Sequence, residues 1–175
     1  MEKEPEKFRT IITELQSMVE VDQAMRNRCI NNPNEWDETV DHRNTKRLKV
    51  IIDEIGWPSI SKVGYEGSSN AWLLVQHSDN DPDFQKHCLG LMKSEPQGEV
   101  SKRDIAYLED RIATADGKPQ IYGTQFHKNS RGQLEPLPIQ DPDNVDKRRE
   151  EMGLETLSEN QKRIQERHGE NQNQQ

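Results

Sequence analysis

The chain contains little of what disulfide bonding or membrane insertion requires. Its 175 residues include only two cysteines, Cys29 and Cys88, and no CxxC pair. Both fall on apolar helical faces, so two buried thiols are expected. No stretch approaches the roughly 20 apolar residues that a membrane span needs. Because the first residues, MEKEPEKF, contain no apolar signal segment, we expect a cytoplasmic protein that does not associate with membranes.

The chain also lacks a net positive charge. The formal net charge is -8, whereas binding to nucleic acid requires basic contacts to phosphates, so no nucleic-acid partner is expected. The five histidines show no recognised metal-ligand spacing, and the GxGxxG, GxxxxGK[ST] and GxSxG motifs are absent. The sequence therefore predicts neither a metal nor a cofactor.

The residues that are present predict a mainly α fold. Hydrophobic residues make up 30% of the chain and are concentrated between positions 8 and 139. We expect one helical domain over residues 5–157, a compact bundle of about five to six helices with a small β-hairpin near residues 119–139. Residues 158–175 are charged and rich in Gln and Asn, which is typical of a frayed helix or a disordered tail.

Hydrophobic periodicity and turn residues place the elements within that domain. Helices are predicted over residues 5–29, 35–55, 71–77, 82–93, 101–115 and 141–152. The Gly- and Ser-rich segment 59–69 is predicted to be a loop, with Asn70 capping the helix after it. Segments 120–126 and 133–139 are predicted to be the two hairpin strands, and Pro136 and Pro138 place the second strand at an edge.

Polar residues interrupt the apolar faces of the first two helices. Asp22 lies at the centre of the first face and Arg26 one turn further on, while Asp41 and Asn44 lie within the second face. Burying an unpaired charge is costly, so these side chains must pair with one another or line a wet cavity. Two interpretations stay open: an ion pair that fixes helix register, and a site that binds a ligand or performs a reaction.

Further polar residues stand at the ends and flanks of later helices. His77 follows Gln76 at a helix C-terminus. The helix dipole alone favours a histidine there. The alternative is that His77 is a general acid or base at the rim of a pocket, with Gln85 among its polar neighbours. Tyr107 and Arg111 share a flank of the 101–115 helix, and Arg111 fits either an anion clamp or a surface ion pair. Asp110, roughly opposite the apolar face of that helix, is expected to be solvated.

Amides and a phenol crowd the first predicted strand. Strand alternation places Gln120, Tyr122 and Thr124 on one face and Gln125 on the other. Such a group supplies neutral hydrogen bonds, which favours recognition of a small polar molecule or a peptide.

Several of these motifs together resemble a family of bacterial proteins of unknown function. The motifs are Gly56-Trp-Pro58, Asn70-Ala-Trp-Leu-Leu-Val-Gln-His77, Asp81-Pro-Asp-Phe-Gln85, Ala106-Tyr-Leu-Glu-Asp-Arg111 and Gln120-Ile-Tyr-Gly-Thr-Gln125. The resemblance extends over about residues 8–157. It implies a mainly α-helical single domain in a bacterial protein, and it carries no activity and no catalytic residues.

Two functions fit these features. In the first, the chain is a cofactor-independent acid–base enzyme, such as a hydrolase, in which His77 is the general acid or base, Asp22 or Asp41 orients it, and Arg26 or Arg111 holds an anionic group. The predicted substrate-binding residues are Arg26, Asn44, Gln76, Gln85, Tyr107, Arg111, Gln120, Tyr122 and Gln125. In the second, the chain is a non-enzymatic module that binds a partner protein or peptide through the amide-rich hairpin.

Overall fold

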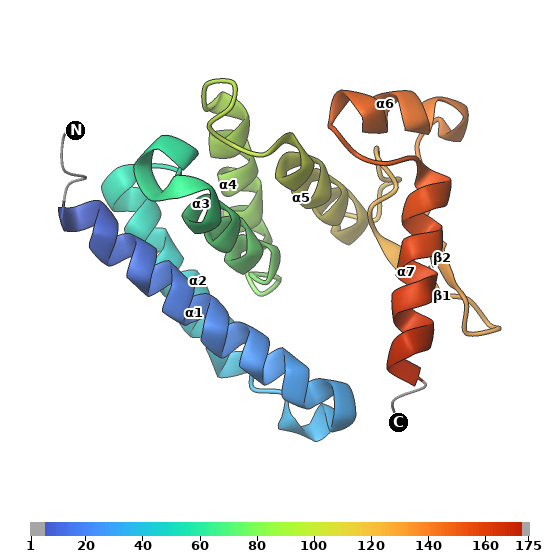
Figure 1. Cartoon of the computed structure of the whole chain (residues 1–175), viewed down its shortest axis with the longest axis horizontal. Helices are drawn as coiled ribbons and strands as arrows, with labels where there is room; N and C mark the ends of the chain where they lie inside the picture. The colour runs from blue at the N-terminus through green and yellow to red at the C-terminus, as the bar shows by residue number, and fades with distance from the viewer. Residues whose placement is uncertain (1–5, 173–175) are drawn as a thin grey trace. The chain divides into compact units, whose positions relative to one another are not determined.

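Seven α-helices and one two-stranded antiparallel sheet make up residues 6–172, the part of the chain that the computed structural model describes (Figure 1). The predicted mainly α fold with a small hairpin is confirmed. Within residues 6–172, no helix has the length and apolar character that crossing a membrane requires. The chain divides into two units, Met1–Ser101 and Lys102–Gln175.

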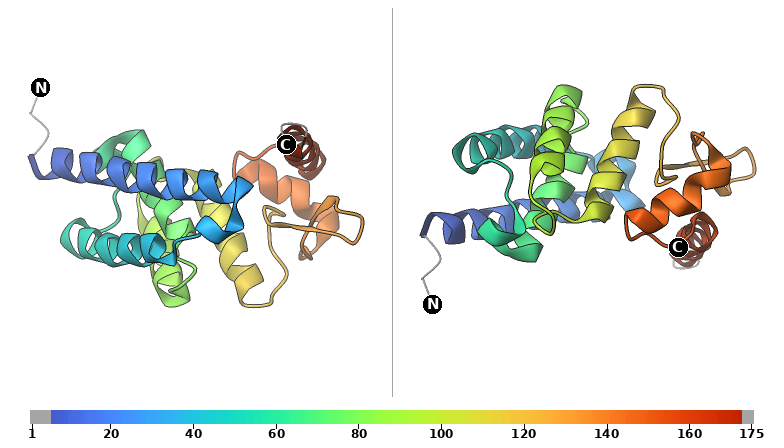
Figure 2. Two further views of the ribbon diagram at one scale, coloured as in Figure 1. Left: turned by 90° about the horizontal axis from the view of Figure 1, so that it is seen from below. Right: turned by 90° about the horizontal axis from the view of Figure 1, so that it is seen from above.

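The first unit contains α1 (Glu6–Asn31), the 3-10 turn η1 (Pro33–Glu35), α2 (Glu38–Ile55), α3 (Ile60–Gln76) and α4 (Pro82–Ser94). Helices α1 and α2 run alongside each other in opposite directions (Figure 2). Ion pairs link them at three levels: Lys7 with Glu54, Glu14 with Arg47, and Arg26 with Asp41. The antiparallel register brings the middle of α1 close to the first turns of α2, which places Asp22 near Asp41.

The core of the first unit is formed by the predicted apolar faces. Its most deeply buried members include Leu15, Met25, Leu48, Ile51, Trp57, Ala71, Leu74, Val75 and Cys88. Burial raises the pKa of the Cys88 thiol to about 12, so this thiol stays protonated and unreactive. Cys29 is only half-buried, which corrects the expectation that both thiols would be buried.

Helix α3 corrects the predicted loop over residues 59–69. The two glycines that suggested a loop serve other purposes: Gly64 takes φ of 73° at a kink inside the helix, and Gly67 allows a close approach. A Cβ atom on Gly67 would lie 2.9 Å from Cβ of Val63. Because the helix continues through residue 70, Asn70 is not its cap.

Substitution of Gly67 by alanine is expected to lower the free energy of unfolding by about 1–3 kcal/mol, because Val63 is buried and cannot move aside. Gly90 is the matched control, since it is an exposed glycine within α4 with open space around its missing Cβ. Gly90→Ala is expected to raise the free energy of unfolding by about 0.5–1 kcal/mol. Urea denaturation of both variants measures the two effects, and equal shifts would contradict the close approach at Gly67.

The second unit contains α5 (Lys102–Ala115), β1 (Phe126–Lys128), β2 (Leu134–Pro136), the 3-10 turn η2 (Pro142–Asn144), α6 (Val145–Glu151) and α7 (Leu157–Gln172). The strands pair from Phe126 with Pro136 to Lys128 with Leu134, so the hairpin is shorter than predicted. Residues 121–125 form no strand, and Gln120 makes an isolated parallel bridge with Ile139.

Helix α7 occupies most of the segment for which a frayed helix or a disordered tail was expected. The helix extends to Gln172, and Asn160 within it is completely buried. Residues 173–175 lie outside the described part of the chain. The proposed limits of a single domain, residues 5–157, stay a prediction.

Candidate functional site

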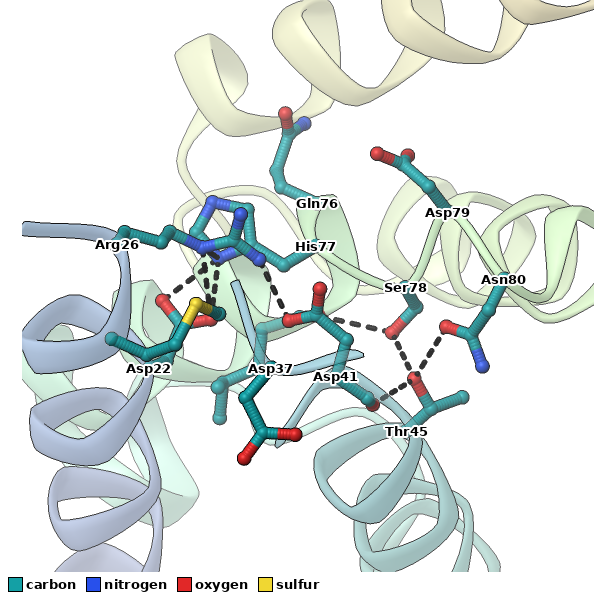
Figure 3. Close-up of polar contacts among 12 residues, drawn as sticks. Asp22, Arg26, Asp37, Asp41, Thr45, Gln76, His77, Ser78, Asp79 and Asn80 are labelled. Carbon is teal, nitrogen blue, oxygen red and sulfur yellow. Dashed lines mark hydrogen bonds and ion pairs between the residues drawn. The ribbon is translucent and has the colours of Figure 1, made fainter. Parts of the chain in front are cut away.

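Asp22 is the centre of a polar network in the first unit (Figure 3). Its carboxylate is completely buried within α1 and accepts hydrogen bonds from Gln23 Nε2 at 2.8 Å and Arg26 Nε at 3.1 Å. Nδ1 of His77 lies 3.0 Å from Oδ1 and 2.9 Å from Oδ2 of the same carboxylate. The buried charge of Asp22 is therefore paired with neighbouring donors, which is one of the two arrangements expected from the sequence.

His77 reaches this carboxylate because it directly follows the last residue of α3. Its backbone N–H donates to the Leu73 carbonyl at 3.2 Å, and the N–H of Ser78 donates to the Val75 carbonyl at 3.0 Å, which ends the helix. Nδ1 also lies 3.0 Å from Arg26 Nε. Arg26 Nε can donate to Nδ1 when Nδ1 carries the lone pair, and Nδ1 can donate to Asp22 when it carries the proton, so the tautomer decides which contact is a hydrogen bond. With the proton on Nδ1, Nε2 carries the lone pair.

Arg26 connects the two carboxylates of the network. Nη2 donates to Asp41 Oδ1 at 2.7 Å while Nε contacts Asp22, and the guanidinium lies 4.9 Å from the centre of the Trp36 ring. Two of its nitrogens are therefore engaged inside the protein. This arrangement makes Arg26 a residue that positions Asp22 and Asp41.

The environment separates the acidities of Asp22 and Asp41. Burial alone would raise the pKa of Asp22, but hydrogen bonds and charges from His77, Gln23 and Arg26 outweigh burial and lower the pKa. For Asp41, burial is the largest influence and raises the pKa, aided by the negative charge of Asp22 and opposed by Arg26 and His77. Two nearby carboxyl groups with opposite shifts are typical of acid–base sites.

A second layer of contacts fixes α2 against the segment that follows His77. Oγ1 of Thr45 lies 2.8 Å from the Asp41 carbonyl, 3.0 Å from Ser78 Oγ and 3.2 Å from Asn80 Oδ1. Figure 3 shows these groups meeting between α2 and the turn after α3. This layer holds the helix that bears Asp41 in a fixed position relative to His77.

The other predicted residues of the first unit lie apart from these bonds. Gln85 Nε2 donates to the Val75 carbonyl and to Asp79 Oδ1, both at 3.1 Å, so it secures the end of α3. Gln76 points away from Asp22 and Asp41 in Figure 3. Nε2 of Gln76 and Nδ2 of Asn44 are buried and find no hydrogen-bond partner in the described part of the chain.

The remaining predicted residues belong to the second unit. Gln120 is completely buried; its Nε2 donates to the Gln125 and Leu137 carbonyls at 3.0 and 2.8 Å, and its Oε1 accepts from Gln125 N. Tyr122 is half-buried, and burial, aided by Glu109, raises its pKa to about 12. Tyr107 and Arg111 lie on α5. The Gln120 side chain therefore stabilises the local backbone. The network around Asp22 contains only residues of the first unit.

The expectation that Asp110 is solvated is wrong, because this carboxylate is completely buried. It accepts hydrogen bonds from the backbone N–H groups of Ile121, Tyr122 and Thr124, at 2.7, 3.0 and 2.9 Å. Arg149, also buried, donates to the Tyr122 carbonyl at 2.7 Å. Asp110 and Arg149 therefore hold the segment that was predicted to be a strand as a turn instead.

Sequence reasoning also missed two neighbours of the Asp22 network. Gln23 donates to Asp22, and Trp36 stacks on Arg26 while 48% of its surface stays exposed. Trp36 lies between acidic residues at 35 and 37 in the first turn of the predicted 35–55 helix, and this position was the available signal for an exposed aromatic group. Within residues 6–172, no group of three histidine, cysteine or acidic side chains is arranged to hold a metal ion.

Comparison with families of known proteins gives a match over most of the chain. The family model described as "Family of unknown function (DUF6624)" matches residues 10–172. No curated protein and no solved structure matches the chain. The match extends over both units, so the Asp22 network and the Asp110 turn both lie inside the family region.

Proposed function

The chain belongs to this family of unknown function, and we propose that it is a cofactor-independent acid–base enzyme, such as a hydrolase, that acts on a small polar molecule or peptide. The contact of His77 Nδ1 with the buried Asp22 carboxylate, at 2.9 Å, carries the proposal. A histidine with one nitrogen held by a carboxylate and the other available is the arrangement that general-base catalysis uses.

The proposed reaction begins at Nε2 of His77. This atom accepts a proton from a water molecule or a substrate hydroxyl as the new bond forms to the reacting carbon. The imidazolium that results is stabilised by Asp22, whose lowered pKa keeps it ionised. The positive charge that develops on Nδ1–H faces the carboxylate directly, so an opposite charge is already in place where the charge of the transition state forms.

Asp41 is assigned to the second proton transfer. Burial raises the pKa of Asp41, and this is the direction that suits a group that donates a proton to a leaving atom. Arg26 contacts both carboxylates and keeps them at a fixed separation. In this scheme Arg26 positions the catalytic groups, and His77 and Asp41 exchange protons with the substrate.

His77→Gln is expected to reduce turnover by about 10²–10⁴-fold, because glutamine keeps a polar side chain but cannot exchange a proton. The measurement is a screen of the purified chain against ester, amide and glycoside substrates, followed by kinetics on any substrate that is turned over. His87→Gln, a change at an exposed histidine on α4, is the matched control and is expected to retain full activity.

A tautomer measurement tests the geometry without a substrate. Long-range ¹H–¹⁵N correlation spectra at neutral pH are expected to show the proton of neutral His77 on Nδ1. Asp22→Asn is expected to weaken this preference. A neutral His77 with its proton on Nε2, or activity that survives His77→Gln, would refute the assignment of His77 as the general base.

The alternative is a non-enzymatic module that binds a partner protein or peptide through the hairpin. Gln161 and Gln165 of α7 both point their Nε2 atoms at the Leu134 carbonyl of β2, at 3.4 and 3.3 Å. With Pro136 in the same strand, little of this edge is left to accept a partner strand. We therefore place the enzyme first, and binding that depends on hairpin substitutions but not on His77 would reverse this order.

A further inference from the structure

A cleft of about 270 Å³ lies between α2 and α4, lined by residues that the Asp22 network does not use. Its apolar lining comes from Ile52 and Phe84, both buried. Its polar lining comes from Lys49 and Asp53 of α2, from Asp81 at the cap of α4, and from Asp83 and His87 of α4. Its volume is just below the range of small-molecule sites, so it suits a small ligand or one side chain.

The charges around the cleft do not balance. The Lys49 ammonium pairs with Asp81, and Asp81 also caps α4 by accepting from Phe84 N at 3.0 Å. Asp53 and Asp83 are exposed at the rim, and neither has an ion-pair partner among residues 6–172. With Lys49 and Asp81 neutralising each other, the cleft keeps two negative charges that attract a cation.

The aromatic lining of the cleft already accepts a cation. Lys49 Nζ lies 5.4 Å from the centre of the Phe84 ring, within the distance at which an ammonium group is attracted to an aromatic face. Lys49 is itself half-exposed, at 46% of its side-chain surface. A ligand cation can displace it from both the ring and Asp81 at small cost, because an exposed ion pair contributes little.

We propose that this cleft is a binding site for an organic cation, either an alkylammonium or a guanidinium group. The two uncompensated carboxylates attract the cation, Phe84 contacts it, and Lys49 occupies its place when the ligand is absent. This site is separate from the reaction proposed at His77, so either proposal can fail without the other.

The test is an NMR titration of the full chain with N-acetyl-arginine amide and with N-acetyl-citrulline amide, which has the same shape without the charge. The arginine compound is expected to shift backbone amides of residues 81–87 with a Kd near 1 mM, and the citrulline compound to leave them unchanged. The double variant with Asp53→Asn and Asp83→Asn is expected to weaken binding about tenfold, from two surface charge interactions.

Lys49→Met gives the sharpest result. Removing this cation is expected to strengthen binding of the arginine compound several-fold, because Phe84 and Asp81 become free. If Lys49→Met left binding of the arginine compound unchanged or weakened it, the proposal would be refuted. Equal binding of the citrulline compound, or no shifts at about 10 mM of the arginine compound, would also refute it.

Parallel titrations with butylguanidine and the peptide Gly-Arg-Gly separate two sources of the cation. Tighter binding of the peptide supports a site for a protein side chain, and tighter binding of butylguanidine supports a site for a free amine or guanidine. Both results require that binding weakens as salt concentration rises, since surface charges are screened.

Discussion

Asp22→Asn is expected to lower the free energy of unfolding by about 3 kcal/mol at neutral pH, at the lower end of the cost of breaking a buried ion pair. The carboxylate is completely buried and contacts Gln23, Arg26 and His77. Asparagine offers one oxygen in place of two and turns an NH₂ group toward these donors. Arg26 keeps its bond to Asp41, which limits the loss. Urea denaturation followed by circular dichroism measures the change.

Asp53→Asn is the control for this prediction, because Asp53 is an exposed aspartate in the same unit. Its substitution is expected to change the free energy of unfolding by less than about 0.5 kcal/mol. If Asp22→Asn were equally mild, the carboxylate would contribute no net stability, and the network would owe its arrangement to the packing of α1, α2 and α3.

The effect of Asp22→Asn depends on pH with a definite sign. The folded state lowers the pKa of Asp22, so its stabilisation is complete above the ordinary aspartate pKa, near 3.9, and is lost as pH falls through the lower folded pKa. The folded state raises the pKa of Asp41, so Asp41 affects stability in the opposite direction. As pH rises from the ordinary aspartate pKa to the raised one, the ionisation of Asp41 lowers the free energy of unfolding. The difference between wild type and Asp22→Asn should therefore shrink below about pH 4.

Helical periodicity predicted the convergence of Asp22, Arg26 and Asp41, because all three interrupt apolar faces that must pack together. His77 joined this prediction through its place at a helix end. The observed register of α1 against α2, however, also brings together pairs such as Glu14 with Arg47. Surface ion pairs of this kind leave no periodic signal, so the sequence alone indicated that the residues were close but not which atoms bond.

The second unit was predicted less well for a related reason. The partners of Asp110 are backbone N–H groups 11–14 residues later, and every residue type except proline supplies such a donor. No side-chain pattern marks them. Helical periodicity shows only where Asp110 lies relative to the apolar face of its own helix. The N–H groups of Ile121, Tyr122 and Thr124 bond to it from a different segment. In α3, likewise, Gly64 and Gly67 suggested a loop because composition does not distinguish a kink from a turn.

Asp110→Asn is expected to lower the free energy of unfolding by about 3–5 kcal/mol, one of the largest effects of any single change in the chain. Both carboxylate oxygens accept: Oδ1 bonds to the N–H of Ile121 and Tyr122, and Oδ2 to the N–H and hydroxyl of Thr124. Asparagine replaces one oxygen with a donor that opposes these groups. Each buried donor left without a partner costs about 1–3 kcal/mol.

Thr124→Val is a milder comparison, because it leaves the backbone N–H bonds to Asp110 in place. It removes the hydroxyl that donates to Oδ2 at 3.0 Å and accepts from Gln125 Nε2 at 3.1 Å, so a loss of about 1–2 kcal/mol is expected. Asp143→Asn, at an exposed aspartate of the same unit, is expected to have almost no effect. Native-state hydrogen exchange locates the change, because the amides of Ile121, Tyr122 and Thr124 should lose protection first in Asp110→Asn. Unchanged protection at these three amides would mean that Asp110 does not hold the turn, and that Arg149, through the Tyr122 carbonyl, suffices.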